Sequence, residues 1–203
     1  MKKKIINKCM KIIKDNSPEL NETKLAEIEY GLVAIYLLIT KLVIILILAY
    51  IIGIFKEVII FSFLYSIIRS PSFGIHASKS WICLLTSSII FLGVPYLCLI
   101  LHITLEIKLI LGIIASLFIL KNSPADTHKR PIINQTRRKI YKTISVIIAL
   151  SFSLLSLIIT NNYISNCLIF ALITQCFIIS PLIYKIFKMP YNNYKAYLPM
   201  TNS

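Results

Sequence analysis

The chain has 203 residues, of which 57% are hydrophobic and only 15% are charged. A soluble domain carries about a quarter charged residues, so the long Ile- and Leu-rich blocks exclude an ordinary soluble domain and predict a membrane protein. The net charge of +14 is accompanied by no motif of a nucleic-acid module, so we expect basic loops beside anionic lipid rather than a nucleic-acid partner.

A short basic helix is predicted at the start of the chain, over residues 2–14. Its apolar side chains fall on one helical face and its lysines are spread around the rest, a pattern typical of a helix on the inner leaflet. Ser17 is then expected to cap a second helix, with Pro18 at the first helical position. Residues 1–30 are therefore predicted to form cytoplasmic interfacial helices.

Six apolar blocks follow, and they predict an all-α, polytopic membrane bundle of about six transmembrane helices in a single domain over residues 1–203. The second block is short, and Gly93 and Pro95 are expected to kink the third span. The predicted segments are spans one and two over 32–68, a loop and helix start over 69–83, spans three and four over 81–120, a basic loop over 121–142, spans five and six over 143–187, and a tail over 188–203.

The distribution of basic residues predicts the orientation of these spans. With six spans and the N-terminus inside, the cytoplasmic segments hold 19 of the 22 Lys and Arg residues. The outer turns hold only Lys56 and Lys108, and Lys41 lies within the first span. Because cytoplasmic loops carry an excess of Lys and Arg, we expect both termini to be cytoplasmic in a multi-pass protein of the bacterial cell membrane.

Only residues 69–86 suggest catalytic chemistry, because a histidine and a cysteine occur there where a loop enters a helix. An imidazole can take the proton of a thiol, and the thiolate can then attack a carbonyl. His76 and Cys83 are seven residues apart, which on one straight helix would separate them by about 10 Å along the axis. Proton transfer needs hydrogen-bond reach, so the loop is expected to fold back.

If Ser80 caps the third span, Cys83 falls at the third helical position, where the helix dipole favours a thiolate; Ser78 is an alternative cap. No acidic partner of His76 is evident nearby, and nothing in the sequence connects Asp126 to it. From chemistry alone, incidental residues are the alternative interpretation. The five cysteines show no paired spacing, so we expect no metal and no cofactor.

Three stretches resemble the accessory gene regulator B family, whose members are membrane-embedded cysteine endopeptidases of bacterial quorum sensing. The first is the run Arg69-x4-Gly74-x-His76-Ala77-x5-Cys83. The second is Glu29-Tyr30-Gly31 before the first span. The third is Ser123-Pro124-Ala125-Asp126-Thr127-x-Lys129-Arg130-Pro131-Ile132, followed by Arg137-Arg138-Lys139. Length and the order of spans match as well, and Ile75 is bulkier than the small residue that the family often has there.

The resemblance implies that Cys83 is the nucleophile and His76 the general base in cleavage of a small amphipathic propeptide with an acidic C-terminal tail. The thioester intermediate would then be closed by the peptide itself into a thiolactone or lactone ring. Arg69 and Gly74 would contribute to substrate binding, although both residue types are more often structural. The residues that would attract the acidic tail are Lys129, Arg130, Arg137, Arg138 and Lys139. The family also suggests a homodimer.

Two other kinds of protein stay open at this point. A small membrane transporter or exporter predicts internal repeats and several buried ionisable groups, and we find no repeat and only Lys41 clearly inside a span. A non-catalytic membrane scaffold predicts no special reactivity of Cys83.

Overall fold

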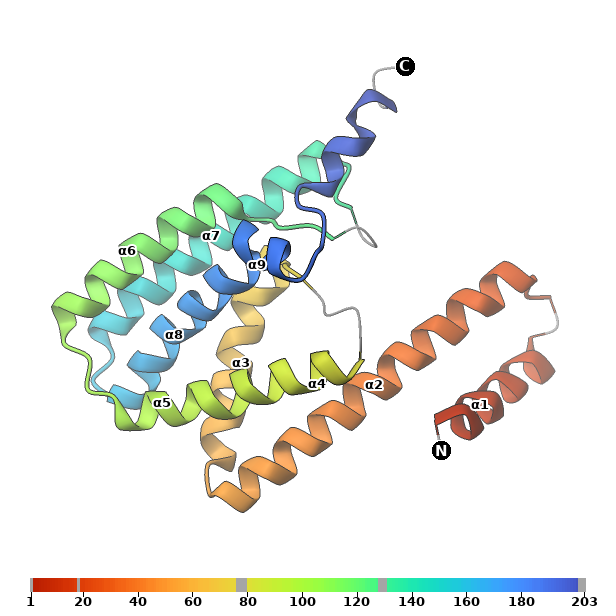
Figure 1. The fold of residues 1–203 in the computed structure, drawn as a ribbon, viewed down its shortest axis with the longest axis horizontal. Coiled ribbons are helices and arrows are strands. Elements are labelled where there is room, and N and C mark those ends of the chain that lie inside the picture. Colours follow the sequence, from red (N-terminus) through yellow and green to blue (C-terminus); the bar gives the residue numbers. More distant parts are fainter. Residues whose placement is uncertain (1, 18, 76–79, 128–130, 201–203) are drawn as a thin grey trace. The chain divides into compact units, whose positions relative to one another are not determined.

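The computed structural model describes residues 2–17, 19–75, 80–127 and 131–200, and all regular elements within them are helices (Figure 1). This confirms the predicted all-α fold. The elements are α1 (Lys2–Asn16), α2 (Glu22–Ile52), α3 (Phe55–Ser72), α4 (Ser80–Ser88), a π turn (Ile89–Gly93), α5 (Val94–Ile100), α6 (Leu105–Asn122), α7 (Gln135–Ile158), α8 (Asn162–Ile179), α9 (Pro181–Ile186) and a 3-10 helix (Asn193–Met200).

The chain divides into two compact units, Met1–Leu48 and Ala49–Ser203. The first unit holds α1 and most of α2. In it α2 begins at Glu22, because the side chain of Asn21 accepts a hydrogen bond from the Lys24 backbone N–H at 3.0 Å. The helix start predicted after Ser17 is therefore wrong, and Asn21 provides the cap.

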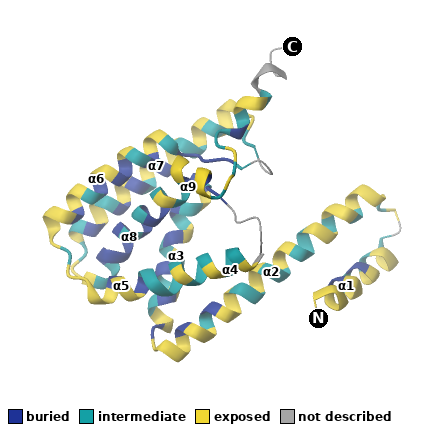
Figure 2. Cartoon of the chain, in the orientation of Figure 1, coloured by how far each residue is buried: buried dark blue, intermediate teal, exposed yellow. Residues whose placement is uncertain are grey.

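The second unit is a helical bundle around α8, which packs against α3, α5, α6 and α7. In the apolar stretch of α8, 56% of the residues are buried, and Figure 2 shows buried positions concentrated along this helix. Small residues bring α6 and α7 close together: a Cβ on Gly112 would lie 2.8 Å from Ser153 Oγ, and Ser116 Oγ lies 3.3 Å from the same atom. Such packing of small side chains is typical of helices that associate in lipid.

Four helical segments in the described part of the chain are long and apolar enough to cross a membrane: Glu22–Ile52, Trp81–Ile100, Gln135–Ile158 and Asn162–Ile179. The protein is therefore a membrane protein. The predicted second and fourth spans correspond to α3 and α6, which each carry three charged residues in 18. Six spans and the orientation of the termini stay predictions.

Helix ends differ from the predicted loop boundaries in ways that matter for the site. The chain stays helical through Pro71, so Arg69 lies on α3 and not in a loop. The basic segment becomes helical at Gln135, because the Asn134 side chain accepts a hydrogen bond from the Arg137 N–H at 3.0 Å. The predicted loop over 121–142 is thus helical at both ends, within α6 up to Asn122 and within α7 from Gln135.

The last predicted span is shorter than expected. Helix α8 ends at Ile179, and Ser180 has an extended backbone before Pro181, as is usual for a residue that precedes proline. Ser180 also caps α9, since its Oγ accepts from the Leu182 N–H at 3.3 Å. The predicted disturbance of span three is a π turn at Ile89–Gly93, directly before Pro95, whose missing N–H cannot complete a regular turn.

One basic residue lies in an unexpected place. Lys108 was assigned to an outer turn, but it is 97% buried in α6, with a relative exposure of 3%, and its Nζ donates to Ser165 Oγ at 2.7 Å. Only the tertiary packing of α6 against α8 could reveal this contact.

Candidate active site

The predicted nucleophile, Cys83, lies in the first turn of α4 and is half-buried. Its predicted base, His76, lies outside the described residues, as do Lys129 and Arg130. Helix α3 ends at Ser72 and α4 begins at Ser80, and the predicted fold-back between His76 and Cys83 stays a prediction because His76 lies outside the described residues. The structure does describe the chain that leads to His76, up to Ile75.

Arg69 holds this segment from the α3 side. Its Nη1 donates to the carbonyl of Phe73, and its Nη2 donates to the carbonyl of Ile75 at 2.9 Å. A guanidinium has five donors in a rigid fork, which suits it to bind two carbonyls at once. The observed contacts of Arg69 are therefore structural, and its contact with substrate stays a prediction.

Gly74 is at the tightest point of the segment. Its φ of +119° is a conformation that residues with a side chain rarely adopt. A Cβ at this position would collide with Arg69 Nη1 and would come within 2.7 Å of the Ile178 side chain. Glycine is required here because the backbone passes directly between the guanidinium of Arg69 and helix α8.

Two further elements hold the same segment. Phe73 and Ala125 form an isolated parallel bridge, in which the Gly74 N–H donates to the Ala125 carbonyl at 2.8 Å and the Ala125 N–H donates to the Ser72 carbonyl at 3.0 Å. From α8, the Gln175 Nε2 donates to the Phe73 carbonyl at 2.9 Å. The backbone before His76 is thus fixed by α3, by α8 and by the segment that follows α6.

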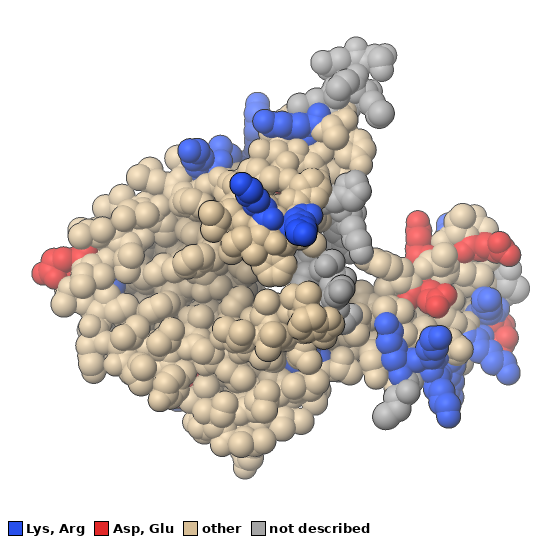
Figure 3. Space-filling view, in the orientation of Figure 1, with Lys and Arg blue, Asp and Glu red and all other residues tan. Residues whose placement is uncertain are grey.

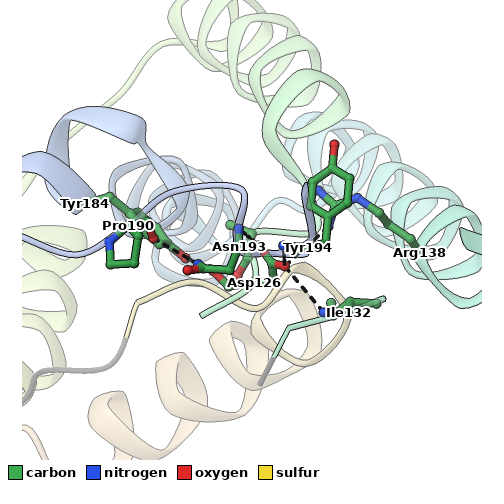
Figure 4. Close-up of polar contacts among 8 residues, drawn as sticks. Asp126, Ile132, Arg138, Tyr184, Pro190, Asn193 and Tyr194 are labelled. Atoms are coloured by element: carbon green, nitrogen blue, oxygen red, sulfur yellow. Dashed lines mark hydrogen bonds and ion pairs between the residues drawn. The ribbon is translucent and has the colours of Figure 1, made fainter. Parts of the chain in front are cut away.

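Asp126 is the centre of the adjoining polar cluster (Figure 4), and its side chain is only 1% exposed. Its Oδ1 accepts from the Asn193 N–H at 3.2 Å, and its Oδ2 accepts from the Tyr194 N–H at 2.9 Å and from the Ile132 N–H at 3.4 Å. Arg138 Nη1 lies 3.8 Å from the same Oδ2. The carboxylate therefore holds both α7 and the C-terminal segment, residues 181–200, at Asp126. Its neighbour Ala125 is paired with Phe73.

The C-terminal segment also holds this cluster through side chains. The Tyr184 hydroxyl lies 3.1 Å from the Ala125 carbonyl and 3.0 Å from the Asp126 carbonyl, and the Asn193 Nδ2 donates to the Asp126 carbonyl at 3.3 Å. Burial raises the pKa of the Tyr191 hydroxyl, Arg138 opposes that change, and the charge of Asp126 adds to it. The sequence indicated only a tail rich in Tyr and Asn, so these roles were missed.

The basic residues of α7 divide into two kinds. Arg138 is half-buried, pairs with Asp126, and places its guanidinium carbon 3.6 Å from the centroid of the Tyr194 ring. Arg137 and Lys139 are exposed. Figure 3 shows basic side chains gathered at the end of the second unit that carries the C-terminal segment, while most of the visible surface of that unit is uncharged.

The described residues of the predicted site are a thiol on α4 and, separately, the hydrogen-bonded backbone that ends at Ile75. Among the residues that the structure describes, no group of three His, Cys, Asp or Glu side chains could hold a metal ion. Cys98 and Cys167 are buried within the bundle, whereas Cys83 is half-buried at a helix start. Cys176 of the same unit is half-buried as well, within α8, and Cys83 differs from it by lying in the first turn of a helix.

A profile of the family described as Accessory gene regulator B matches residues 6–179. An AgrB-like protein of Clostridium acetobutylicum is 29% identical over 171 residues, which cover 84% of this chain and 82% of the relative. An AgrB-like protein of Listeria innocua is 30% identical over 175 residues, which cover 84% of each chain. No solved structure matches the chain significantly.

Proposed function

The chain belongs to the accessory gene regulator B family, and from this premise we propose that it is a membrane-embedded cysteine endopeptidase that processes a signalling propeptide. Family membership supports a role in the agr quorum-sensing system. The observation that carries the finer proposal is the fixed backbone from Phe73 to Ile75, which delivers the chain to His76, seven residues before Cys83 at the start of α4.

In the proposed reaction, the Cys83 thiol gives its proton to His76 and its sulfur attacks the carbonyl carbon of the scissile bond. The C–N bond then breaks, and His76 returns the proton to the leaving amine of the acidic tail. A thioester between Cys83 and the N-terminal part of the propeptide results. The peptide's own Cys or Ser then attacks this carbonyl and passes its proton by way of His76 to the departing Cys83 sulfur. The products are a thiolactone or lactone and free enzyme.

Arg69 and Gly74 have a positioning role in this proposal. The two carbonyls bound by Arg69 flank the Gly74 peptide group, so loss of either residue would free the backbone that leads to the base. A misplacement of a reacting group by about 1 Å can lower the rate 10²-fold, so the position of the backbone before His76 is important for catalysis. The acidic tail of the propeptide would be attracted by exposed cations such as Arg137, together with Lys129 and Arg130.

The test is cleavage by the purified full-length protein in lipid nanodiscs. The substrate is a synthetic peptide with an amphipathic start, an internal Cys or Ser, and an acidic end. Cys83→Ala and His76→Ala are expected to reduce cleavage to background, because each removes one half of the reacting pair. Cys9→Ala is the matched control, since Cys9 is also half-buried but lies in α1.

Two measurements interpret the result. Mass spectrometry of the wild-type reaction should detect a thioester adduct on Cys83 and a cyclic product that lacks one water relative to the linear fragment. Full cleavage by Cys83→Ala protein would refute the proposal. Binding of the peptide without cleavage by the wild type would instead favour a scaffold.

A further inference from the structure

A cavity of about 470 Å³ lies in the second unit where α6 ends, α7 begins and the C-terminal segment passes. Its size is that of a small-molecule pocket. Four of its lining residues are basic, namely Lys121, Arg138, Lys139 and Lys142. None of the described residues that line it is acidic. The cavity is therefore a site of concentrated positive charge that the proposed peptidase chemistry does not use.

The charge in this cavity is only partly balanced. Arg138 forms the one ion pair found among the described residues, and its partner is Asp126. The amino groups of Lys121, Lys139 and Lys142 have no carboxylate within 4 Å in the part of the chain that the structure describes. Three ammonium groups around one cavity repel one another, and an anion between them relieves that repulsion.

A second observation points to a ligand with hydrogen-bond acceptors. Ser123 lines the cavity and is 96% buried, with a relative exposure of 4%. In the described part of the chain, its Oγ has no hydrogen-bond partner, whereas the Nη1 of Arg138 faces Asp126 Oδ2 at 3.8 Å. Buried polar groups are nearly always paired in proteins, so a buried hydroxyl without a partner beside several basic side chains indicates a binding site for an oxyanion.

The position of the cavity along α6 and α7 indicates which kind of anion it binds. Between Lys108 and Lys121 helix α6 has no charged residue, and beyond Lys142 helix α7 has none. The cavity therefore lies at the boundary between the charged and the uncharged stretches of two neighbouring helices, which is the depth of lipid headgroups. Basic pockets between helices at this depth are typical binding sites of anionic headgroups.

We propose that this cavity binds the phosphate group of an anionic phospholipid headgroup. The lysines supply point charges to the phosphate, and the Ser123 hydroxyl donates to one of its oxygens. The bound lipid would lie against Tyr191, next to the residues that hold Asp126. The site is distinct from Cys83, and binding can be measured without any substrate.

The test uses full-length protein in a zwitterionic detergent, titrated with short-chain phosphatidylglycerol and examined by native mass spectrometry. One tightly bound lipid is expected, with at least tenfold weaker binding of phosphatidylcholine. Lys121→Gln and Lys139→Gln should each weaken phosphatidylglycerol binding about fivefold. Ser123→Ala keeps the charge and should weaken it about threefold, because only a hydrogen-bond donor is lost.

Arg137→Gln is the matched control, since it removes one positive charge from the same turn of α7 but does not line the cavity. It should change lipid binding less than twofold, and circular dichroism should show that all variants keep their helix content. An equal loss in Arg137→Gln protein, or no loss in the two lysine variants, would overturn the proposal. Inorganic phosphate binding as tightly as the lipid would show a free-phosphate site instead. Displacement of the lipid by a synthetic acidic peptide at lower concentration would assign the cavity to peptide.

Discussion

The two sides of the proposed His76–Cys83 site are built differently. The segment before His76 is held by hydrogen bonds from Arg69 of α3, Gln175 of α8 and the backbone at Ala125. Helix α4, which carries Cys83, has no fully buried residue among those whose side chains are described. In the apolar stretch of the segment from Trp81 to Ile100, only 11% of the residues are buried.

The half of the site before His76 therefore depends on tertiary contacts, whereas α4 depends mainly on its own helical hydrogen bonds. Substitutions on the fixed side should therefore disturb stability and activity together. Substitutions in α4 should leave stability unchanged, and they should reduce activity only where they alter the reacting groups.

Gly74→Ala should lower stability by about 3 kcal/mol, because the alanine Cβ would collide with Arg69 and Ile178 at a φ of +119°. Thermal unfolding in detergent micelles measures it. Gly31→Ala is the matched control, since a Cβ there meets nothing within 4 Å and alanine favours the helix. Equal melting temperatures for the two variants would show that the fixed side is not rigid.

Asp126→Asn should cost about 2 kcal/mol of stability, because the amide loses the ion pair with Arg138 and can accept fewer of the backbone N–H groups. In the peptidase assay, kcat should fall while KM stays within about twofold, as expected when the geometry of the site is disturbed rather than substrate binding. Asp15→Asn, at an exposed position of α1, should change neither quantity. A rise in KM alone would indicate that Asp126 acts on the substrate.

Leu85→Ala in α4 should change stability by less than about 0.5 kcal/mol, because Leu85 is 53% exposed. Leu172→Ala in α8 is the reference, since Leu172 is fully buried and its truncation should cost about 2–5 kcal/mol. The same unfolding measurement compares the two leucines. A large loss for Leu85→Ala would mean that α4 is packed as firmly as the other side of the site.

The smallest effect should be seen at alkaline pH. Burial raises the pKa of Tyr191, so the native state keeps the phenol proton that the unfolded state releases near pH 10. The stability that this proton contributes is fully present below pH about 10 and is lost as the pH rises through the native pKa. Asp126→Asn should lower the pKa of Tyr191, because it removes a negative charge and leaves Arg138 unopposed. Absorbance titration against Tyr191→Phe protein measures the change.

Sequence patterns were sufficient for the features that depend on local order. Long apolar blocks predicted an all-α membrane protein because a spanning helix satisfies its own backbone, and the four candidate spans agree with this. The run from Arg69 to Cys83 indicated the family, which the match over residues 6–179 confirms. The spacing of His76 and Cys83 also predicts a fold-back of the chain between them, which stays a prediction because His76 lies outside the described residues.

Contacts between distant parts of the chain could not be predicted in the same way. Asp126 and Tyr194 are 68 residues apart and Phe73 and Gln175 are 102 apart, and no periodicity encodes either pair. Hydropathy, charge and a short motif are local properties, and they were enough to predict the membrane class, the family and the candidate dyad. The helix packing was needed to show that Arg69 binds backbone carbonyls, that Asp126 anchors the C-terminal segment, and that four basic residues line one cavity. These arrangements arise when buried polar groups find partners in whichever helices the packing brings beside them.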